Sequence, residues 1–453
     1  MTAKLLISRR LISSSNVNSD SNTTFDVSSL LNQINFIRNR QHQKKSSSSH
    51  QLPSSIIATG SKKISKFKRS THPTSVPLVK LLFTAGFFPL SIKESLDDYA
   101  FRKQPLKFQQ ELLNLLPFYP NPDTNGKTSS IVQTVIDDKG NFINEFVVYP
   151  PGKSEADSHT MNHIVLVHGY GGGLGFFLKN FDGLSNLDNW CVHGIDLLGY
   201  GCSSRPPFKL KEESLDHVED FFHESFEIWL NKRGLSNLAP NAKLLVVGHS
   251  MGAYLMATYG IRNNPNFCDR LLMLSPGAII KHRKPVSVPK YFEKLWEQNI
   301  SPFTLVRQLG PFGSKIVSGW SSRRFANLSP EENKCLHRYA YGIFSSPGSG
   351  EYMLNYLLAP GANARHPLIE RGIHKLKCKV SWWYGSEDWM DIKGGQLCSE
   401  IINNYAKDSE KSRVFEFEDS GHHLYLENTD KFHTKMLEEM KSMESEVKED
   451  KHI

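Results

Sequence analysis

The chain has 453 residues, of which 39% are hydrophobic and 11% aromatic, so it can bury a sizeable core and is not disordered as a whole. Its net charge of +8 is unevenly distributed, because residues 1–75 hold 12 Lys/Arg and two acids while the other 378 residues hold 42 Lys/Arg and 44 Asp/Glu. The basic excess therefore belongs to the N-terminal extension, which argues against a nucleic-acid-binding face on the folded body. No apolar run reaches 18 residues, so a membrane-spanning helix is not expected.

The first 19 residues have the composition of a mitochondrial targeting segment. They contain Lys4, Arg9 and Arg10, no acid and several serines. The alternative is a solvated basic tail. Residues 13–75 are rich in Ser and Asn with few apolar side chains, which predicts disorder. The basic cluster at 62–69 could also contact anionic lipid. We therefore expect an extension over 1–75 and a mitochondrial location, in the matrix or on the inner membrane.

Residues 76–90 are apolar but too short to span a membrane, and they contain Lys80, Pro77 and Pro89. They either pack on the domain or lie at a lipid surface. We assign 76–129 to an N-terminal helical segment.

From about residue 130, short apolar strands alternate with helical segments. Residues 131–136 and 142–148 predict a hairpin, and further strands are expected at 163–167, 190–195, 244–247, 271–274, 380–384 and 414–417. Such alternation indicates an α/β fold with a mostly parallel sheet and helices on both faces.

The predicted core comprises 130–276 and 371–442. Residues 277–370 do not show this alternation of strands and helices. They contain Pro, Gly, aromatic residues and a helical stretch at 291–298, which indicates a lid. A charged tail is expected at 443–453.

The clearest chemical motif is Gly248-His249-Ser250-Met251-Gly252, between the strand at 244–247 and a predicted helix at 253–261. This context is typical of a nucleophile elbow, in which a tight turn exposes the Ser hydroxyl at the start of a helix. A tight turn with an incidental Ser is the alternative. We expect Ser250 to be a nucleophile.

A Ser nucleophile needs a base and an acid that orients the base, and in this strand–turn–helix context the chain order is Ser, acid, His. Asp388 follows the strand at 380–384 and is our choice of acid, with Asp391 as the alternative. Either one could instead be a solvated loop carboxylate. His422 comes directly after Gly421, beyond the last strand, and is our choice of base.

The oxyanion formed in acyl transfer needs two backbone N–H donors. One is expected from Met251, directly after the nucleophile, and the other from the loop after the strand at 163–167. That loop contains Tyr170, our choice of donor, with Gly171 as the alternative. Neither a metal motif nor a C-x-x-C pair occurs, so no metal or other cofactor is expected and the six cysteines are expected to be reduced.

Together these residues resemble the α/β-hydrolase superfamily over roughly 130–440. Three segments are similar to the subfamily of α/β-hydrolase-domain proteins 4 and 5 and their mitochondrial relatives, the cardiolipin-specific deacylases and lysophosphatidic acid acyltransferases: 196–206 (DLLGYGCSSRP), 301–313 and 364–368 (ARHPL). The subfamily often carries His-x-x-x-x-Asp at the catalytic His, a motif associated with acyl transfer. Here Glu427 stands at that spacing from His422, which keeps the charge on a longer side chain.

The resemblance implies a serine hydrolase that deacylates phospholipids at a peripheral membrane surface, with cardiolipin as the leading candidate. Its first alternative is an acyl-CoA-dependent lysophosphatidic acid acyltransferase. The second is a non-catalytic scaffold that regulates a lipase, against which the presence of Ser250 argues.

Overall fold

The computed structural model describes residues 90–208, 214–282, 288–325 and 328–446. The predicted targeting segment, the extension to residue 75 and most of the apolar stretch at 76–90 lie outside these residues. Within the described part of the chain, no helix is both long enough and apolar enough to cross a membrane.

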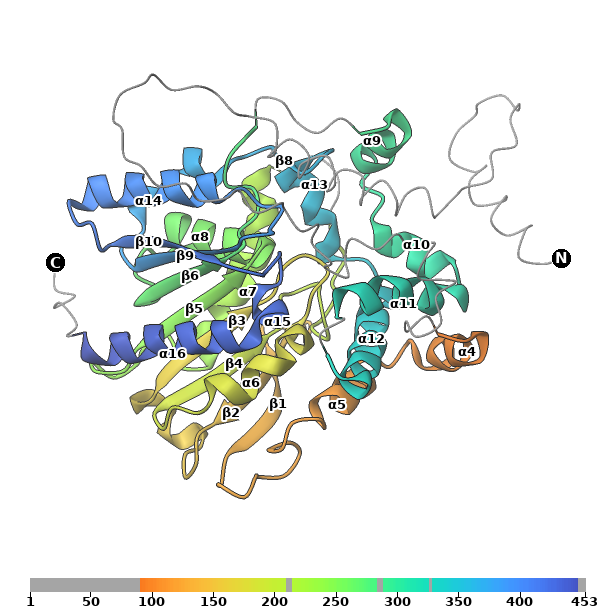
Figure 1. The fold of residues 1–453 in the computed structure, drawn as a ribbon, viewed down its shortest axis with the longest axis horizontal. Coiled ribbons are helices and arrows are strands. Elements are labelled where there is room, and N and C mark those ends of the chain that lie inside the picture. The colour runs from red at the N-terminus through yellow and green to blue at the C-terminus, as the bar shows by residue number, and fades with distance from the viewer. Residues whose placement is uncertain (1–89, 209–213, 283–287, 326–327, 447–453) are drawn as a thin grey trace, which may run out of the picture.

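The centre of the described chain is an eight-stranded sheet in the order β1-β2-β4-β3-β5-β6-β9-β10 (Figure 1). Its strands are β1 (Thr128–Val135), β2 (Phe142–Tyr149), β3 (Asn162–Val167), β4 (Trp190–Ile195), β5 (Leu244–His249), β6 (Arg270–Leu274), β9 (Lys379–Gly385) and β10 (Ser412–Phe417). The β1–β2 hairpin and the β2–β4 pairing are antiparallel, and all other pairings are parallel. The predicted hairpin and the mostly parallel α/β sheet are therefore confirmed.

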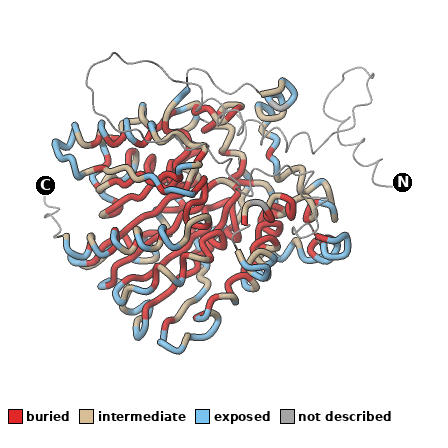
Figure 2. Tube along the Cα trace, in the orientation of Figure 1, coloured by how far each residue is buried: buried red, intermediate tan, exposed pale blue. Residues whose placement is uncertain are grey.

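Helices cover both faces of the sheet because successive side chains of a strand point to opposite sides. On one face, Val165 and Val246 pack in a core with α7 (Leu215–Lys232), α8 (Met251–Arg262) and α14 (Ile392–Ala406). On the other, Ile164 and Val247 pack with α6 (Leu178–Leu184), α15 (Leu424–Glu427) and α16 (Thr429–Ser445). Figure 2 shows the strands as the most deeply buried part of the molecule.

A helical group lies between β6 and β9 in the chain. It consists of α9 (Lys290–Glu297), α10 (Pro302–Gln308), α11 (Phe312–Arg324), α12 (Pro330–Ser345) and α13 (Leu354–Leu357), with a short ribbon of β7 (Leu358–Ala359) and β8 (Asn363–Ala364). The earlier helices α4 (Ile92–Phe101) and α5 (Pro105–Leu113) pack on this group, beyond one end of the sheet (Figure 1). Asp98 of α4 pairs with Arg338 of α12 at 3.2 Å, which ties the N-terminal helices to the lid region.

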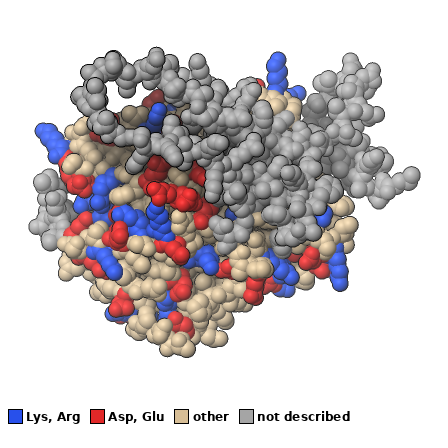
Figure 3. Space-filling view, in the orientation of Figure 1, with Lys and Arg blue, Asp and Glu red and all other residues tan. Residues whose placement is uncertain are grey.

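Two observed bounds differ slightly from the prediction. β1 begins at Thr128, two residues before the expected core, and α16 continues to Ser445, so the expected tail at 443 begins inside a helix. Over the described surface that is visible in Figure 3, acidic and basic side chains are interspersed, in keeping with the small net charge beyond residue 75.

Candidate active site

Ser250 lies in a strained turn between β5 and α8. Its φ of 53° and ψ of −112° are unusual for a residue with a side chain. The turn is tight: a Cβ on Gly248 would lie 2.6 Å from Ala253 Cα, and one on Gly252 would lie 2.3 Å from the His168 carbonyl oxygen. Both positions therefore need Gly, which explains the spacing of the motif around Ser250.

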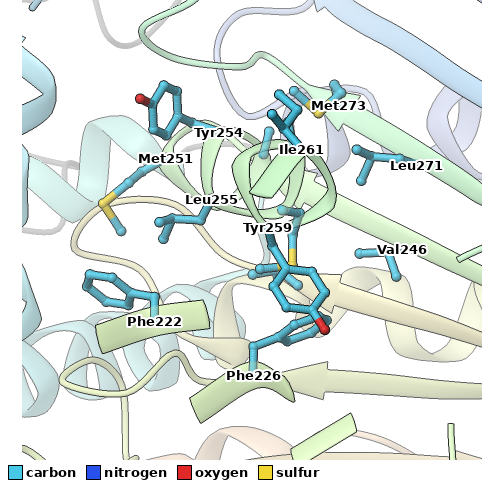
Figure 4. Close-up of a cluster of buried hydrophobic side chains, with 14 of the residues drawn as sticks. Phe222, Phe226, Val246, Met251, Tyr254, Leu255, Tyr259, Ile261, Leu271 and Met273 are labelled. Carbon is cyan, nitrogen blue, oxygen red and sulfur yellow. The ribbon is translucent and has the colours of Figure 1, made fainter. Parts of the chain in front are cut away.

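The helix that follows Ser250 is firmly anchored. From Met251 to Ile261 every residue of α8 is buried. Figure 4 shows Phe222 and Phe226 of α7 beside Leu255 and Tyr259 of α8. Because close-packed side chains resist displacement, the start of α8 is a rigid support for the Ser250 hydroxyl.

The structure brings Ser250, His422 and Asp388 together. His422 Nε2 lies 3.1 Å from Ser250 Oγ, and His422 Nδ1 lies 3.0 Å from Asp388 Oδ1. Burial alone would raise the pKa of Asp388, but its interactions with His422, and to a smaller extent with Ser275 and Met390, together outweigh burial and the pKa is lowered. A carboxylate at Asp388 accepts a hydrogen bond from His422 Nδ1–H, so Nε2 is left free to take the proton of the Ser250 hydroxyl.

Asp391 has a different position. Its Oδ1 accepts a hydrogen bond from the backbone N–H of Lys393 at 3.0 Å, and it is the N-cap of α14. A carboxylate in this place satisfies a helix N-terminus. Of the two candidate acids, the geometry therefore favours Asp388.

The loop after β3 closely approaches the nucleophile. A Cβ on Gly169 would lie 2.9 Å from Ser250 Cβ, and Tyr170 and Gly171 follow directly. Met251 is the first residue of α8, where backbone N–H groups have no partner inside the helix. The loop and the helix start thus both adjoin Ser250, and the donor roles of Tyr170 and Met251 in an oxyanion hole remain predictions.

Aromatic side chains of the lid region cover this loop. The ring of Tyr170 stacks on Phe303 of α10 with a centroid distance of 5.4 Å, and Phe303 stacks on Phe344 of α12 at 4.6 Å. Helices inserted after β6 thereby reach the immediate surroundings of Ser250. α10 and α12 therefore form part of the covering of the loop beside Ser250.

Two residues that support the site were not singled out from the sequence. Asp196 accepts the N–H groups of Leu174 and Cys202 at 2.6 and 2.7 Å, so it joins the loop after β3 to the segment 196–206. His249 contacts the backbone of His422 through Nε2 at 2.9 Å. The sequence could have indicated Asp196, because this residue begins the segment 196–206 that resembles the subfamily. The position of His249 beside Ser250 gives no indication that it contacts His422.

A second cluster of titratable groups lies at the other end of β3. His163, Cys191 and His193 place their potential ligand atoms within 4.8 Å of one another. No local sequence motif indicates this cluster, because it is strand pairing that sets His163 opposite Cys191. However, His163 Nδ1 and His193 Nε2 already form a hydrogen bond at 2.8 Å. These ring nitrogens are thus satisfied by each other without a metal ion.

The cysteines agree with the sequence-based expectation. All six lie in the described part of the chain and none forms a disulfide.

Comparison with known proteins gives a consistent family. A model described as the α/β hydrolase fold matches residues 162–429. A probable 1-acylglycerol-3-phosphate O-acyltransferase of Oryza sativa subsp. japonica is 31% identical over 287 residues, 60% of this chain and 65% of the relative. A 1-acylglycerol-3-phosphate O-acyltransferase of Arabidopsis thaliana is 31% identical over 290 residues, with the same shares. A human (lyso)-N-acylphosphatidylethanolamine lipase is 29% identical over 276 residues, 58% of this chain and 75% of the relative.

The chain spans slightly less than two thirds of the length of the two plant relatives. These matches confirm the predicted resemblance, and the region matched by the family model contains Ser250, Asp388 and His422. Since that region is more than half of the sequence, the chain belongs to the α/β-hydrolase fold family.

Proposed function

We propose that the protein is a serine hydrolase that cleaves acyl esters of phospholipids. The observation that carries the proposal is the hydrogen-bonded chain from Ser250 through His422 to Asp388, with distances of 3.1 and 3.0 Å. The lipase and acyltransferase names of the relatives both describe acyl chemistry on phospholipids, which supports this substrate class.

The reaction follows from the geometry. Ser250 Oγ attacks the acyl carbonyl while His422 Nε2 takes its proton, and Asp388 stabilises the imidazolium that forms. The N–H groups of Met251 and Tyr170 stabilise the oxyanion, each worth about 3–4 kcal/mol of the barrier. His422 returns the proton to the departing lysophospholipid oxygen, which leaves an acyl ester on Ser250. Water activated by His422 then releases the fatty acid and restores the Ser250 hydroxyl.

Acyl transfer is the second candidate, because the two plant relatives are named acyltransferases and Glu427 keeps an acid at the motif position after His422. In this version acyl-CoA acylates Ser250, the CoA thiol leaves, and the hydroxyl of lysophosphatidic acid replaces water as the acceptor. Both activities share the acyl-enzyme, so they differ only in donor and acceptor.

Cardiolipin is the phospholipid that we propose first, and the mitochondrion is the proposed location, with the protein bound peripherally to the inner membrane or in the matrix. The support is the composition of residues 1–19 and the resemblance of 196–206, 301–313 and 364–368. Cell fractionation of the full chain and of a chain that starts at residue 76 tests the location. Mitochondrial recovery of both forms would argue against a targeting role for the extension.

The activity is tested with the purified full chain, given cardiolipin vesicles in one reaction and lysophosphatidic acid with acyl-CoA in another, and mass spectrometry of the lipids. Monolysocardiolipin and free fatty acid support the deacylase, whereas phosphatidic acid without net fatty-acid release supports the acyltransferase. Ser250→Ala is expected to lower kcat by at least about 10⁴-fold. Ser386→Ala, an exposed serine near Asp388, is the matched control and should keep full activity. Equal activity of wild type and Ser250→Ala, or no product from either, would reject the proposal.

A further inference from the structure

The loop that carries His422 is held by groups beside the other two members of the site. It connects β10 to α15, and the His422 carbonyl accepts a hydrogen bond from His249 Nε2 at 2.9 Å. The Ser420 carbonyl accepts the N–H of Glu387 at 2.8 Å. His249 directly precedes Ser250 and Glu387 directly precedes Asp388. The His249 side chain next to the nucleophile and the Glu387 backbone N–H next to the acid thus attach the loop at two points.

Glu427 supplies a third attachment. The one-turn helix α15 reverses the chain, with the Glu427 N–H bonded to the His423 carbonyl at 2.9 Å. This turn brings the carboxylate back to Gly421, whose N–H donates to Glu427 Oε2. A hydrogen bond from an amide to a carboxylate is stronger than one between neutral groups. The residue directly before His422 is therefore held by a charged acceptor.

The contact depends on Gly at position 421. A Cβ there would lie 2.7 Å from Glu427 Oε2, closer than a carbon and an oxygen can approach without displacement. A side chain at 421 would push the carboxylate away from the N–H it accepts. Gly421 and Glu427 consequently act as one unit, although five residues separate them in the sequence.

We propose that Glu427 is a positioning residue, whose carboxylate holds the Gly421 N–H and thereby places His422 against Ser250, and that it serves hydrolysis and acyl transfer equally. The proposal rests on the proposed function for the identity of the two reactions. In this role the acid of the His-x-x-x-x-acid motif binds a backbone N–H group of the protein itself. If the acid instead bound or activated the acyl acceptor, its substitution would change the rate of acyl transfer alone.

The two roles make different predictions for conservative and drastic substitutions. Glu427→Gln keeps an acceptor oxygen at the same length, so kcat of both reactions should stay within about threefold of wild type. Glu427→Ala and Gly421→Ala remove the attachment, and kcat of both reactions should fall by about 10- to 100-fold with KM unchanged, since displacements near 1 Å have such effects. Glu418→Gln, with a side chain that is 84% exposed in the same loop, is the matched control and should not change kcat.

The experiment measures kcat and KM of each variant with cardiolipin and with lysophosphatidic acid plus acyl-CoA, together with the rate of Ser250 labelling by a fluorophosphonate and the melting temperature. Labelling needs no lipid turnover, so a wild-type chain that is labelled but turns over neither lipid rejects the proposed function, and the labelling rates still test the positioning role. Loss of transfer alone in Glu427→Gln overturns the proposal. So does a Glu427→Ala chain with wild-type labelling, or a wild-type chain that is not labelled at all. If Glu427→Ala does not fold, Glu427→Gln and Gly421→Ala give the same decision.

Discussion

Two buried histidine chains lie on the same sheet, and only one of them has the features of an active site. One joins Ser250, His422 and Asp388, and the other joins His163, His193 and Glu145. In both, a His lies between a carboxylate and another polar group. Their difference shows that a carboxylate–histidine pair does not by itself define a catalytic site.

The second chain is closed at both ends. His163 Nε2 must donate to the Ser158 carbonyl at 2.7 Å, since a carbonyl only accepts, and burial followed by the charge of His193 lowers the pKa of His163 to about 3. His163 is therefore neutral, and its Nδ1 accepts from His193. Burial would raise the pKa of Glu145, but His193 and Arg233 outweigh it and the pKa is lowered. The Glu145 carboxylate therefore accepts a hydrogen bond from His193 Nδ1 at 2.6 Å.

The first chain ends differently, in the hydroxyl of the half-buried Ser250 rather than in a backbone carbonyl. Ser250 follows β5, Asp388 follows β9 and the His422 loop follows β10, so the three residues meet at the edge where parallel strands end. The His163 chain begins at the opposite end of β3 and terminates on a backbone carbonyl. Position on the sheet and a reactive terminal group separate the two chains.

The largest expected effect concerns the acid of the first chain. Asp388→Asn should lower kcat by about 10⁴-fold, because an amide cannot hold the His422 tautomer that leaves Nε2 unprotonated. Asp391→Asn should retain nearly full activity, since Asn is as good an N-cap as Asp. Steady-state kinetics with a soluble ester, with melting temperatures as a check on folding, measure both. Equal losses in the two variants would invalidate the choice of Asp388.

The matching change in the second chain should affect stability and not chemistry. Glu145→Gln leaves the buried Arg233 guanidinium without this carboxylate and removes the charged acceptor of His193, so the free energy of unfolding should fall by about 3–5 kcal/mol. Urea unfolding measures this change, and kcat per folded molecule should stay within about threefold of wild type.

Glu155 offers the control, because it pairs with the same Arg233 but its side chain is 68% exposed. Glu155→Gln should lower the free energy of unfolding by less than about 1 kcal/mol. A large fall of kcat in Glu145→Gln at unchanged stability would contradict the separation of the two chains.

The smallest effect is a change in pH dependence. In the unfolded protein His163 is protonated below its ordinary pKa of 6.5, whereas in the folded protein it is protonated only near pH 3. The unfolded state therefore binds more protons between these values, and the free energy of unfolding falls as the pH falls from 6.5 towards 3. The contribution is about 1.4 kcal/mol per pH unit. Buried His168, with a pKa lowered to about 4 by burial, adds to the same trend.

In the His163→Gln variant the free energy of unfolding should therefore depend less steeply on pH, although the dependence should not disappear. Gln also offers an acceptor to His193 and a donor to the Ser158 carbonyl, which limits the structural damage. Urea unfolding of the wild-type protein and of the His163→Gln variant at pH 7, 6 and 5 tests this prediction. If the free energy of unfolding depended on pH in the same way in both proteins, His163 would not be neutral in the folded state.

The sequence by itself determined the local features. The strands at 163–167, 190–195 and 244–247 follow from short apolar runs between helical segments, and the elbow at Ser250 follows from a pentapeptide in which close backbone approach requires Gly. The order of Ser, acid and His also lies in the sequence. The strands and the elbow depend on neighbours in the chain, so periodicity and turn chemistry are sufficient to predict them, and the order of Ser, acid and His follows from the fold that they indicate.

Only the tertiary structure decided which side chains become partners. The sequence favoured Asp388 but left Asp391 open as the alternative, and the choice between them depends on the start of α14, where Asp391 is the N-cap. The contact of Glu427 with Gly421 and the closure of His163 on His193 likewise depend on a one-turn helix and on the register of β3 with β4. The physical reason is that hydrogen bonds between distant residues are selected by the packing of whole elements, which no local pattern of residues specifies.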